Sequence, residues 1–199
     1  MLNLKTGVLD YVLKMKGVIK EPLINLINEQ LYGFDFNKFE RGGIVGGKDK
    51  KNNIETDIRS VKILSLNEDQ IGNSVSNRII FNELKKSVVR IEHSYKEKVS
   101  PYYFSKDSYF QFLYYNDEMK GHYDFHTDYC KEHPRQLTIL IGLNSKQEYA
   151  GGELFVQNHK EGIVLDKGDI VCFPSNFMYP HKVGKVTKGE RKVLVIWTQ

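Results

Sequence analysis

The chain has little cysteine and no long apolar segment, and each of these absences excludes a class of protein. Among its 199 residues there are two cysteines, Cys130 and Cys172. Two cysteines cannot form the disulfide framework of a small secreted domain, and they suit a reducing, cytoplasmic environment. No apolar run approaches the roughly 20 residues that a membrane-spanning helix needs, and no signal-peptide pattern opens the sequence. We therefore expect a cytoplasmic protein that does not associate with a membrane.

Neither sign of charge dominates. The formal net charge is +4, from 29 lysines and arginines against 25 aspartates and glutamates. This mild excess permits a nucleic-acid partner without arguing for one. A composition that is 40% hydrophobic and 27% charged, without repeats, is typical of a globular protein, and the length suits one domain over residues 1–199. The sequence indicates no oligomeric state.

The first half of the chain, residues 1–107, predicts elements that support a sheet. Short strands are expected over residues 9–13 and 54–66, and helices over residues 21–31 and 77–99. In the longer helix, charged residues occupy one side. The other side repeats apolar residues at three- and four-residue steps: Ile80, Phe81, Leu84, Val88, Ile91 and Tyr95. We expect both helices to pack on the outside of a sheet.

A glycine- and lysine-rich segment, residues 41–53, comes close to a phosphate-binding loop. Gly42, Gly47 and Lys48 fit the pattern, but Asp49 stands where a serine or threonine is needed to bind Mg²⁺. A carboxylate there would repel phosphate. The sequence therefore predicts a surface loop, with closure over a nearby substrate as its candidate role.

The second half, residues 108–199, predicts a mainly β core. Apolar and alternating segments separated by glycines and prolines indicate strands over residues 108–115, 121–128, 136–144, 153–157, 163–165, 169–173, 181–186 and 191–198. Such a series of short strands is typical of a double-sheet jelly roll. The expected class is mainly β (α+β), with a jelly-roll core and N-terminal helices.

The segment GHYDFHTDYC carries the residues with the clearest chemistry. His126 and Asp128 are two positions apart, so an extended strand points both side chains to one face, and Tyr123 to the other. His181, in FMYPHKVGKV, is the candidate third ligand. Two histidines and one carboxylate form the facial triad of non-heme iron oxygenases. We expect these three residues to be the metal ligands and the catalytic centre.

With Arg191 ten positions after His181, and Trp197 near the end, this pattern resembles the iron(II)- and 2-oxoglutarate-dependent dioxygenases, in particular the prolyl 4-hydroxylase-like branch. The resemblance covers residues 108–199 and includes Gly-Gly-x-Leu and Gly-Asp-x-x-x-Phe-Pro steps at 151–154 and 168–174. It implies a double-stranded β-helix core, Fe(II), 2-oxoglutarate as cosubstrate, O₂, and ascorbate as a candidate reductant. The implied reaction hydroxylates a C–H bond, most simply of prolyl residues in a peptide or protein, and releases succinate and CO₂.

The resemblance also implies residues that bind the cosubstrate. Arg191 is expected to hold the far carboxylate of 2-oxoglutarate, because strand alternation puts it on one face with Trp197 and puts the runner-up, Lys192, on the other. Tyr115 is expected to approach the cosubstrate. Relatives that hydroxylate hypoxia-related proteins carry a tyrosine where Gly142 stands here, so Thr138 is a candidate for part of that role.

Two further residues are candidates for the surroundings of the metal. Tyr123 is a candidate substrate contact, and His122, four residues before His126, is a candidate neighbour that orients a ligand.

Three other functions stay open from the sequence. The same chemistry could act on a free amino acid or another small molecule. A nucleic-acid demethylase is less favoured, because a second arginine expected after the distal histidine has no counterpart. A non-catalytic jelly-roll module that only binds metal is the third.

Overall fold

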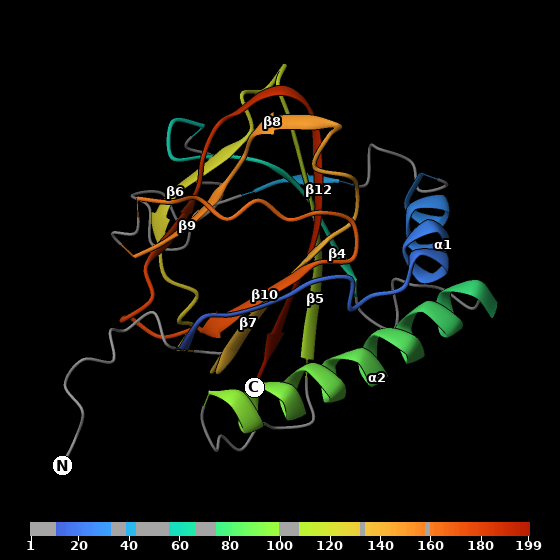
Figure 1. Cartoon of the computed structure of the whole chain (residues 1–199). Helices are drawn as coiled ribbons and strands as arrows, with labels where there is room; N and C mark the ends of the chain where they lie inside the picture. Colours follow the sequence, from blue (N-terminus) through green and yellow to red (C-terminus); the bar gives the residue numbers. More distant parts are fainter. Residues whose placement is uncertain are drawn as a thin grey trace, which may run out of the picture.

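The structure of the chain, a computed structural model, consists of two β-sheets and two helices (Figure 1). It describes residues 11–32, 39–42, 56–66, 75–99, 108–131, 134–157 and 160–199. Most of the predicted loop over residues 41–53 lies outside these ranges; its first residue, Arg41, ends a short strand.

The larger sheet is antiparallel throughout and contains the longest strands. Its strand order is β1-β10-β7-β12-β5-β4-β2, and β8 (Tyr149–Gly151) pairs separately with β12. In that order the strands are β1 (Leu13–Met15), β10 (Ile170–Pro174), β7 (Leu137–Gly142), β12 (Val186–Thr198), β5 (Ser108–Asn116), β4 (Lys62–Leu66) and β2 (Glu40–Arg41).

The smaller sheet faces the larger one and has four strands in the order β3-β6-β11-β9. These are β3 (Arg59–Ser60), β6 (His122–His126), β11 (His181–Val183) and β9 (Leu154–Val156). Strands from residues 1–107 thus take part in both sheets, at the edges β1, β2 and β3 and next to β5.

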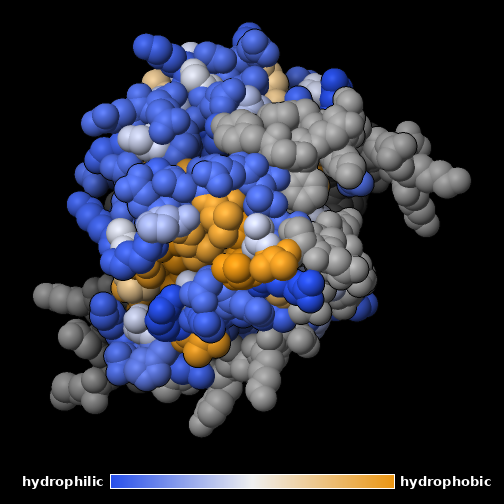
Figure 2. All heavy atoms as spheres, turned by 90° about the vertical axis from the view of Figure 1, so that its right-hand side faces the viewer, coloured by the Kyte–Doolittle hydropathy of each residue, from blue (hydrophilic) through white to orange (hydrophobic). Residues whose placement is uncertain are grey.

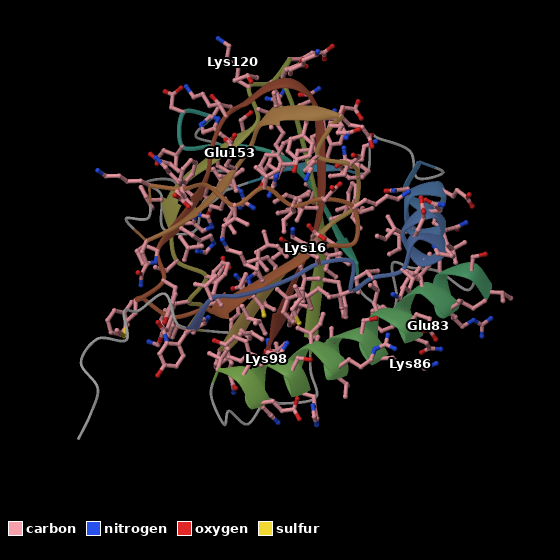
Figure 3. All side chains as sticks on the ribbon, in the orientation of Figure 1. Lys16, Glu83, Lys86, Lys98, Lys120 and Glu153 are labelled. Atoms are coloured by element: carbon pink, nitrogen blue, oxygen red, sulfur yellow. The ribbon has the colours of Figure 1, made fainter. Side chains whose placement is uncertain are left out.

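Both helices cover one face of the larger sheet. Helix α1 (Glu21–Tyr32) has Pro22 in its first turn, where the missing N–H costs nothing, and buries Ile24 and Ile27. Helix α2 (Val75–Lys98) buries its apolar stripe, while Glu83 and Lys86 form an ion pair of 2.7 Å on its outer side (Figure 3). The two helices also contact each other.

The central strands β5 and β12 separate two apolar cores because their side chains alternate between the faces. On the helix side lie Phe110, Phe112, Leu194 and Ile196. On the side of the smaller sheet the buried residues are Leu113, Tyr115, Val193, Val195 and Trp197. The second core therefore fills the space between the two sheets, and any side chain of matching parity on β5 or β12 points into it.

The surface on the helix side is mostly hydrophilic with an apolar patch in its middle (Figure 2). No helix in the described ranges is long and apolar enough to cross a membrane.

The mainly β fold is as predicted, with differences in single elements. Both predicted helices are present to within two residues at each end, and most strands are present, although several are shorter than expected and β12 is longer. The strand expected over residues 163–165 was wrong: Ile163 makes one isolated bridge to Leu154. Of the strand expected over residues 54–66, the structure describes residues 56–66, which contain two strands, β3 and β4; β8 was not predicted.

Candidate active site

Two histidines face each other across the smaller sheet. His126 ends β6 and His181 begins β11, and the antiparallel register places them directly opposite, with ring centroids 4.2 Å apart. Asp128 follows two residues after β6; its Oδ2 lies 3.4 Å from His181 Nε2 and its Oδ1 3.7 Å from His126 Nε2. One ligand atom from each residue lies within 4.8 Å of the others. The structure thus brings together the three residues that the sequence singled out.

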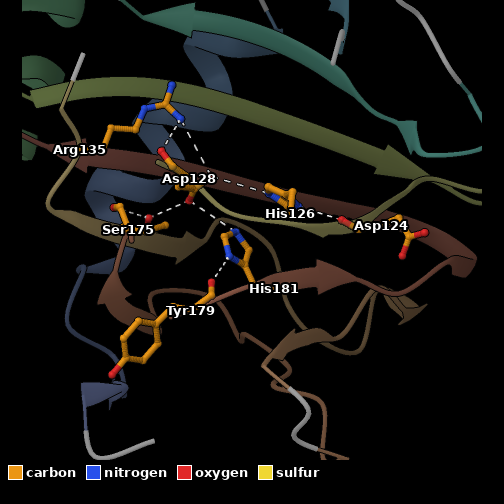
Figure 4. Close-up of polar contacts among 8 residues, drawn as sticks. Asp124, His126, Asp128, Arg135, Ser175, Tyr179 and His181 are labelled. Atoms are coloured by element: carbon orange, nitrogen blue, oxygen red, sulfur yellow. Dashed lines mark hydrogen bonds and ion pairs between the residues drawn. The ribbon is translucent and has the colours of Figure 1, made fainter. Parts of the chain in front are cut away.

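Hydrogen bonds to the backbone orient both imidazoles (Figure 4). His126 Nδ1 lies 2.8 Å from the Asp124 carbonyl oxygen, and His181 Nδ1 lies 3.0 Å from the Tyr179 carbonyl oxygen. A carbonyl oxygen only accepts, so each Nδ1 carries the proton and each Nε2 turns its lone pair toward Asp128. Burial and the neighbouring imidazole of His181 lower the pKa of His126, which keeps the ring neutral, as a metal ligand must be.

Asp128 is buried and held by side chains from neighbouring segments. Thr138 Oγ1, on β7, donates to Asp128 Oδ2 at 2.7 Å and lies 2.8 Å from Ser175 Oγ. Arg135 Nη1 donates to the Asp128 carbonyl oxygen at 3.4 Å and lies 4.0 Å from Oδ1 (Figure 4). Burial alone would raise the pKa of Asp128, but any positive charge on the adjacent His181 and His126 and the hydrogen bond from Thr138 lower it overall. The carboxylate is therefore ionised and fixed in direction.

A β-bulge in β6 decides which residues share a face with His126. His181 pairs with His126, but Val183, two residues later, pairs with Tyr123, three residues earlier. The extra residue reverses the alternation, so Tyr123 lies on the same face as His126 and stacks on its ring at a centroid distance of 3.5 Å. The expectation that Tyr123 points the opposite way was wrong for this reason.

The same bulge turns His122 away from the face that carries His126. Its Nδ1 lies 2.8 Å from the Lys120 carbonyl oxygen and its Nε2 lies 3.0 Å from the Asp57 carbonyl oxygen. Both ring nitrogens are occupied by backbone groups outside the site, so the expected role of His122 in orienting a metal ligand was wrong.

Arg191 is a buried cation in the space between the sheets. It lies opposite Tyr115 in the register of β12 and β5 and is 1% exposed. Gly152, at a φ of +69°, gives it room, because a Cβ there would lie 2.7 Å from Arg191 Cδ. Within the described ranges, Nε, Nη1 and Nη2 of Arg191 have no hydrogen-bond partner. A buried guanidinium without an anion is costly, and its planar fork fits a carboxylate, so this donor set suits a carboxylate ligand.

The neighbouring Lys192 turns to the helix side of the larger sheet. Its Nζ lies 3.0 Å from Glu190 Oε2, and the residue is 7% exposed. Arg191 and not Lys192 therefore faces the space between the sheets, as strand alternation predicted.

A cleft of about 720 Å³ contains the three converging residues and is also lined by Tyr115. The ring of Tyr115 lies 5.2 Å from Arg191 Cζ. Burial raises the pKa of Tyr115; the positive charge of Arg191 opposes this rise, and the negative charge of Asp128 adds to it. The hydroxyl stays protonated and lies within electrostatic reach of both the guanidinium and the carboxylate.

The donor set fits a divalent metal and a dicarboxylate together. Two neutral imidazoles and one carboxylate could hold a metal on one face and leave its other positions open, as in non-heme iron oxygenases. The unpaired guanidinium offers a second anchor for a ligand that reaches from the metal to Arg191.

Comparison with known proteins agrees with this chemistry. Residues 110–199, which contain all three converging residues and Arg191, match the model of the 2OG-Fe(II) oxygenase superfamily. Over these residues the chain is therefore similar to the 2OG-Fe(II) oxygenase superfamily. A PKHD-type hydroxylase of Prochlorococcus marinus (strain MIT 9301) is 29% identical over 183 residues, which are 88% of this chain and 72% of that protein. A second one, from strain NATL2A, is 30% identical over 156 residues, which are 76% of this chain and 60% of that protein.

A solved structure shows the same fold. The prolyl hydroxylase from Trichoplax adhaerens, in complex with a hypoxia inducible factor oxygen degradation domain peptide fragment, superposes with a TM-score of 0.75 at 18% sequence identity. The match covers 95% of this chain and 83% of that chain. The predicted double-stranded β-helix with supporting N-terminal helices is confirmed, as is the predicted enzyme class of 2-oxoglutarate-dependent oxygenase.

The structure does not bring Thr138 to Arg191. Thr138 pairs with Trp197 in the register of β7 and β12, six residues from Arg191. At a rise of about 3.3 Å per residue this separation is about 20 Å along the strand. The contacts of Thr138 favour a role in holding Asp128 over the expected contact with the cosubstrate.

A tyrosine that the sequence analysis missed lies near Arg191. Tyr149 of β8 is buried, and its hydroxyl donates to the Leu165 carbonyl oxygen at 2.8 Å. Burial raises the pKa of Tyr149, and the charge of Arg191 opposes the rise. A side chain at Gly142 would collide with the Asp166 carbonyl oxygen, so this fold has no room for a tyrosine there. Tyr149 could be found only from the pairing of β8 with β12, which the sequence did not reveal.

Proposed function

We propose that the protein is an Fe(II)- and 2-oxoglutarate-dependent dioxygenase that hydroxylates prolyl residues of a peptide or protein. The observation that carries this proposal is the convergence of His126, Asp128 and His181 in one cleft, together with the buried guanidinium of Arg191 next to Tyr115 of the same cleft. A structural role for Arg191 would require an anionic partner within the fold, and none occurs in the described ranges.

Each of these residues has a separate part in the proposal. His126, Asp128 and His181 hold Fe(II), Arg191 binds the far carboxylate of 2-oxoglutarate, and Tyr115 borders the cosubstrate. Bound Fe(II), with 2-oxoglutarate and O₂, supplies an oxidant able to hydroxylate an unactivated C–H bond, with succinate and CO₂ as coproducts. The bonds from both Nδ1 atoms to backbone carbonyls keep each Nε2 available to the metal.

The surrounding groups keep the ligands fixed and the site dry. Thr138 holds one oxygen of Asp128, which leaves the other oxygen free for the metal. Asp128 and His181 are 6% and 4% exposed, so water reaches them mainly through the cleft, and a substrate that fills the cleft excludes it.

The volume of the cleft and the names of the relatives support a peptide or protein substrate. The cleft, of about 720 Å³, is open, and its rim residue Tyr129 is 63% exposed. The similar proteins are named PKHD-type hydroxylases, and the similar structure is a prolyl hydroxylase with a bound peptide. Two further predictions remain: ascorbate as reductant, and a cytoplasmic location, which the two free cysteines support.

The test has two separate readouts. Anaerobic addition of Fe(II) and 2-oxoglutarate should give the weak charge-transfer absorption of the bound pair. With O₂ and a panel of proline-containing peptides, succinate should form and one peptide should gain the mass of one oxygen atom. His181→Ala should remove both signals, whereas His93→Ala, an exposed histidine on α2, should remove neither.

The outcomes separate the parts of the proposal. No charge-transfer absorption would refute the iron and 2-oxoglutarate assignment. Normal absorption with no peptide modified across a broad panel would refute the prolyl substrate and leave the cofactor assignment standing.

A further inference from the structure

The cleft has a positive lining outside the metal ligands. Four cationic side chains line it, those of Arg41, Arg59, Lys131 and Arg135. Apart from the metal-ligand aspartate, Glu40 is the only acidic residue among the described lining. A substrate that enters the cleft therefore meets a surplus of positive charge.

Aromatic rings hold two of these cations in position. Arg59 Cζ lies 4.3 Å from the centre of the Tyr123 ring, which itself stacks on His126. Arg135 Cζ lies 3.9 Å from the centre of the Trp197 ring. Cations stacked in this way lose little further conformational freedom when an anion binds. The two guanidinium groups thus form preorganised contacts beside the residues of the proposed metal site.

The positive lining continues beyond the cleft. An adjoining hollow of about 640 Å³ shares Arg41 and Arg59 with the cleft and adds Lys62, Lys120 and Lys185. Asp57 is its one carboxylate among the described lining residues, and Lys120 lies at one end of the molecule (Figure 3). Together the cleft and the adjoining hollow form a continuous row of positive side chains that begins beside the metal ligands. An extended peptide can lie along this row.

We propose that the cleft and the adjoining hollow bind an acidic segment of a peptide substrate, with aspartate or glutamate side chains flanking the residue that is hydroxylated. This inference rests on the proposed function for the reaction and adds the charge of the substrate. Complementary charge speeds association and rejects basic sequences, because like charges brought together in a cleft are strongly unfavourable.

Carboxylates fit this surface better than a nucleic acid does. Proteins that bind single strands combine cations with aromatic rings on which bases stack. The described lining of the adjoining hollow contains no phenylalanine, tyrosine or tryptophan, and in the cleft the rings of Tyr123 and Trp197 already stack against the guanidinium groups of Arg59 and Arg135. The net charge of +4 and the pI of about 8.8 are also below those of a typical nucleic-acid-binding domain.

The experiment measures peptide binding directly. Fluorescence anisotropy of the full chain, loaded with Mn(II) and 2-oxoglutarate, is recorded with three labelled peptides that differ only in the residues flanking one proline: glutamate, glutamine or lysine. We expect the glutamate peptide to bind roughly tenfold more tightly than the glutamine peptide and the lysine peptide to bind least. The preference should shrink at high salt.

Two double variants with the same change of net charge test where the preference arises. Arg41→Glu with Lys131→Glu reverses two exposed cations of the cleft, and should weaken binding of the glutamate peptide roughly tenfold and abolish the preference. Lys16→Glu with Lys98→Glu reverses two exposed lysines that line neither hollow (Figure 3), and should change binding less than twofold.

Three results would overturn the inference: equal affinity for the glutamate and glutamine peptides, an equal loss in both double variants, or tighter binding of an oligothymidylate with the same dependence on the cleft variant. Hydroxylation of proline peptides regardless of flanking charge would also reject it and leave the proposed function standing. Cleft-dependent binding of the glutamate peptide without any hydroxylation of proline would support the acidic segment and reject the prolyl substrate.

Discussion

Arg191→Met should weaken 2-oxoglutarate binding strongly and leave the fold intact. A carboxylate bound by the guanidinium fork makes two charge-assisted hydrogen bonds, each contributing about 1.5 to 3 kcal/mol. Their loss amounts to about 3 to 6 kcal/mol, or roughly a 10²- to 10⁴-fold lower affinity. Methionine is chosen because it replaces the length of the side chain and brings no charge.

The same change should not lower the free energy of unfolding of the ligand-free protein. Arg191 is 1% exposed, and its three nitrogens have no partner in the described part of the chain. Replacing a buried ionic group by an apolar one is often neutral or stabilising by about 1 to 4 kcal/mol. For a chain of this size, about 1 kcal/mol corresponds to about 2 to 4 °C in melting temperature. The melting temperature without ligand should therefore stay constant or rise.

Thermal unfolding of the Mn(II)-loaded protein with and without 2-oxoglutarate measures both effects. At a ligand concentration of about 100 times Kd the wild-type protein gains about 2.7 kcal/mol, which corresponds to about 5 to 10 °C. Arg191→Met should show no such gain, and Lys192→Met, whose side chain lies on the helix side, should keep it. An unchanged gain in Arg191→Met, or a ligand-free variant that melts several degrees lower, would refute the reasoning.

Three other predictions concern the two residues Gly152 and Thr138 near the site and Glu92 on helix α2. Gly152→Ala should lower both the melting temperature and the affinity for 2-oxoglutarate, because the new Cβ would collide with the buried side chain of Arg191. The control Gly17→Ala is also at positive φ but has open space around it, so it should cost only backbone strain of about 1 kcal/mol. Equal effects of the two variants in melting and ligand titration would contradict this. Thr138→Val removes the hydroxyl that donates to Asp128, so metal affinity, measured by competition with a chelator, should fall about 10- to 100-fold, and an unchanged affinity would show that the carboxylate needs no such support. Burial raises the pKa of Glu92 to about 7 from an ordinary value of 4.5. The stability linked to this proton is therefore complete below about pH 4.5 and is lost as the pH rises through 7. Glu92→Gln should reduce the decline of the free energy of unfolding in urea between about pH 5 and 7, and a decline equal to that of the wild type would count against this.

The sequence predicted the site residues that depend on alternation within a regular strand. Arg191 and Trp197 fall on one face of β12, and Tyr115 falls on the matching face of β5, because both strands run without interruption through the positions concerned. The helices were also predictable, since their apolar residues repeat at the helical period over many turns.

The predictions that failed depend on contacts between distant segments. The bulge in β6 is visible only in its pairing with β11, and it exchanges the faces of His122 and Tyr123. Strand β8 has three residues and exists through its pairing with β12, so Tyr149 carried no local signal. The role expected for Thr138 differs from the one that its contacts favour, because the register of β7 against β12, which sets its distance from Arg191, cannot be read from one segment alone.

The alternation along β12 also places adjacent residues under different evolutionary constraints. Leu194 and Ile196 pack in the core on the helix side, so the fit to the helices constrains them. Val193 and Val195 lie in the core between the two sheets, where the reaction is proposed to occur. Substitutions that repack the outer layer can therefore accumulate without disturbing the chemistry, provided that volume is conserved. During evolution the residues that pack against the helices can therefore change while the reaction is kept, and the residues around the site can change while the packing of the helices is kept.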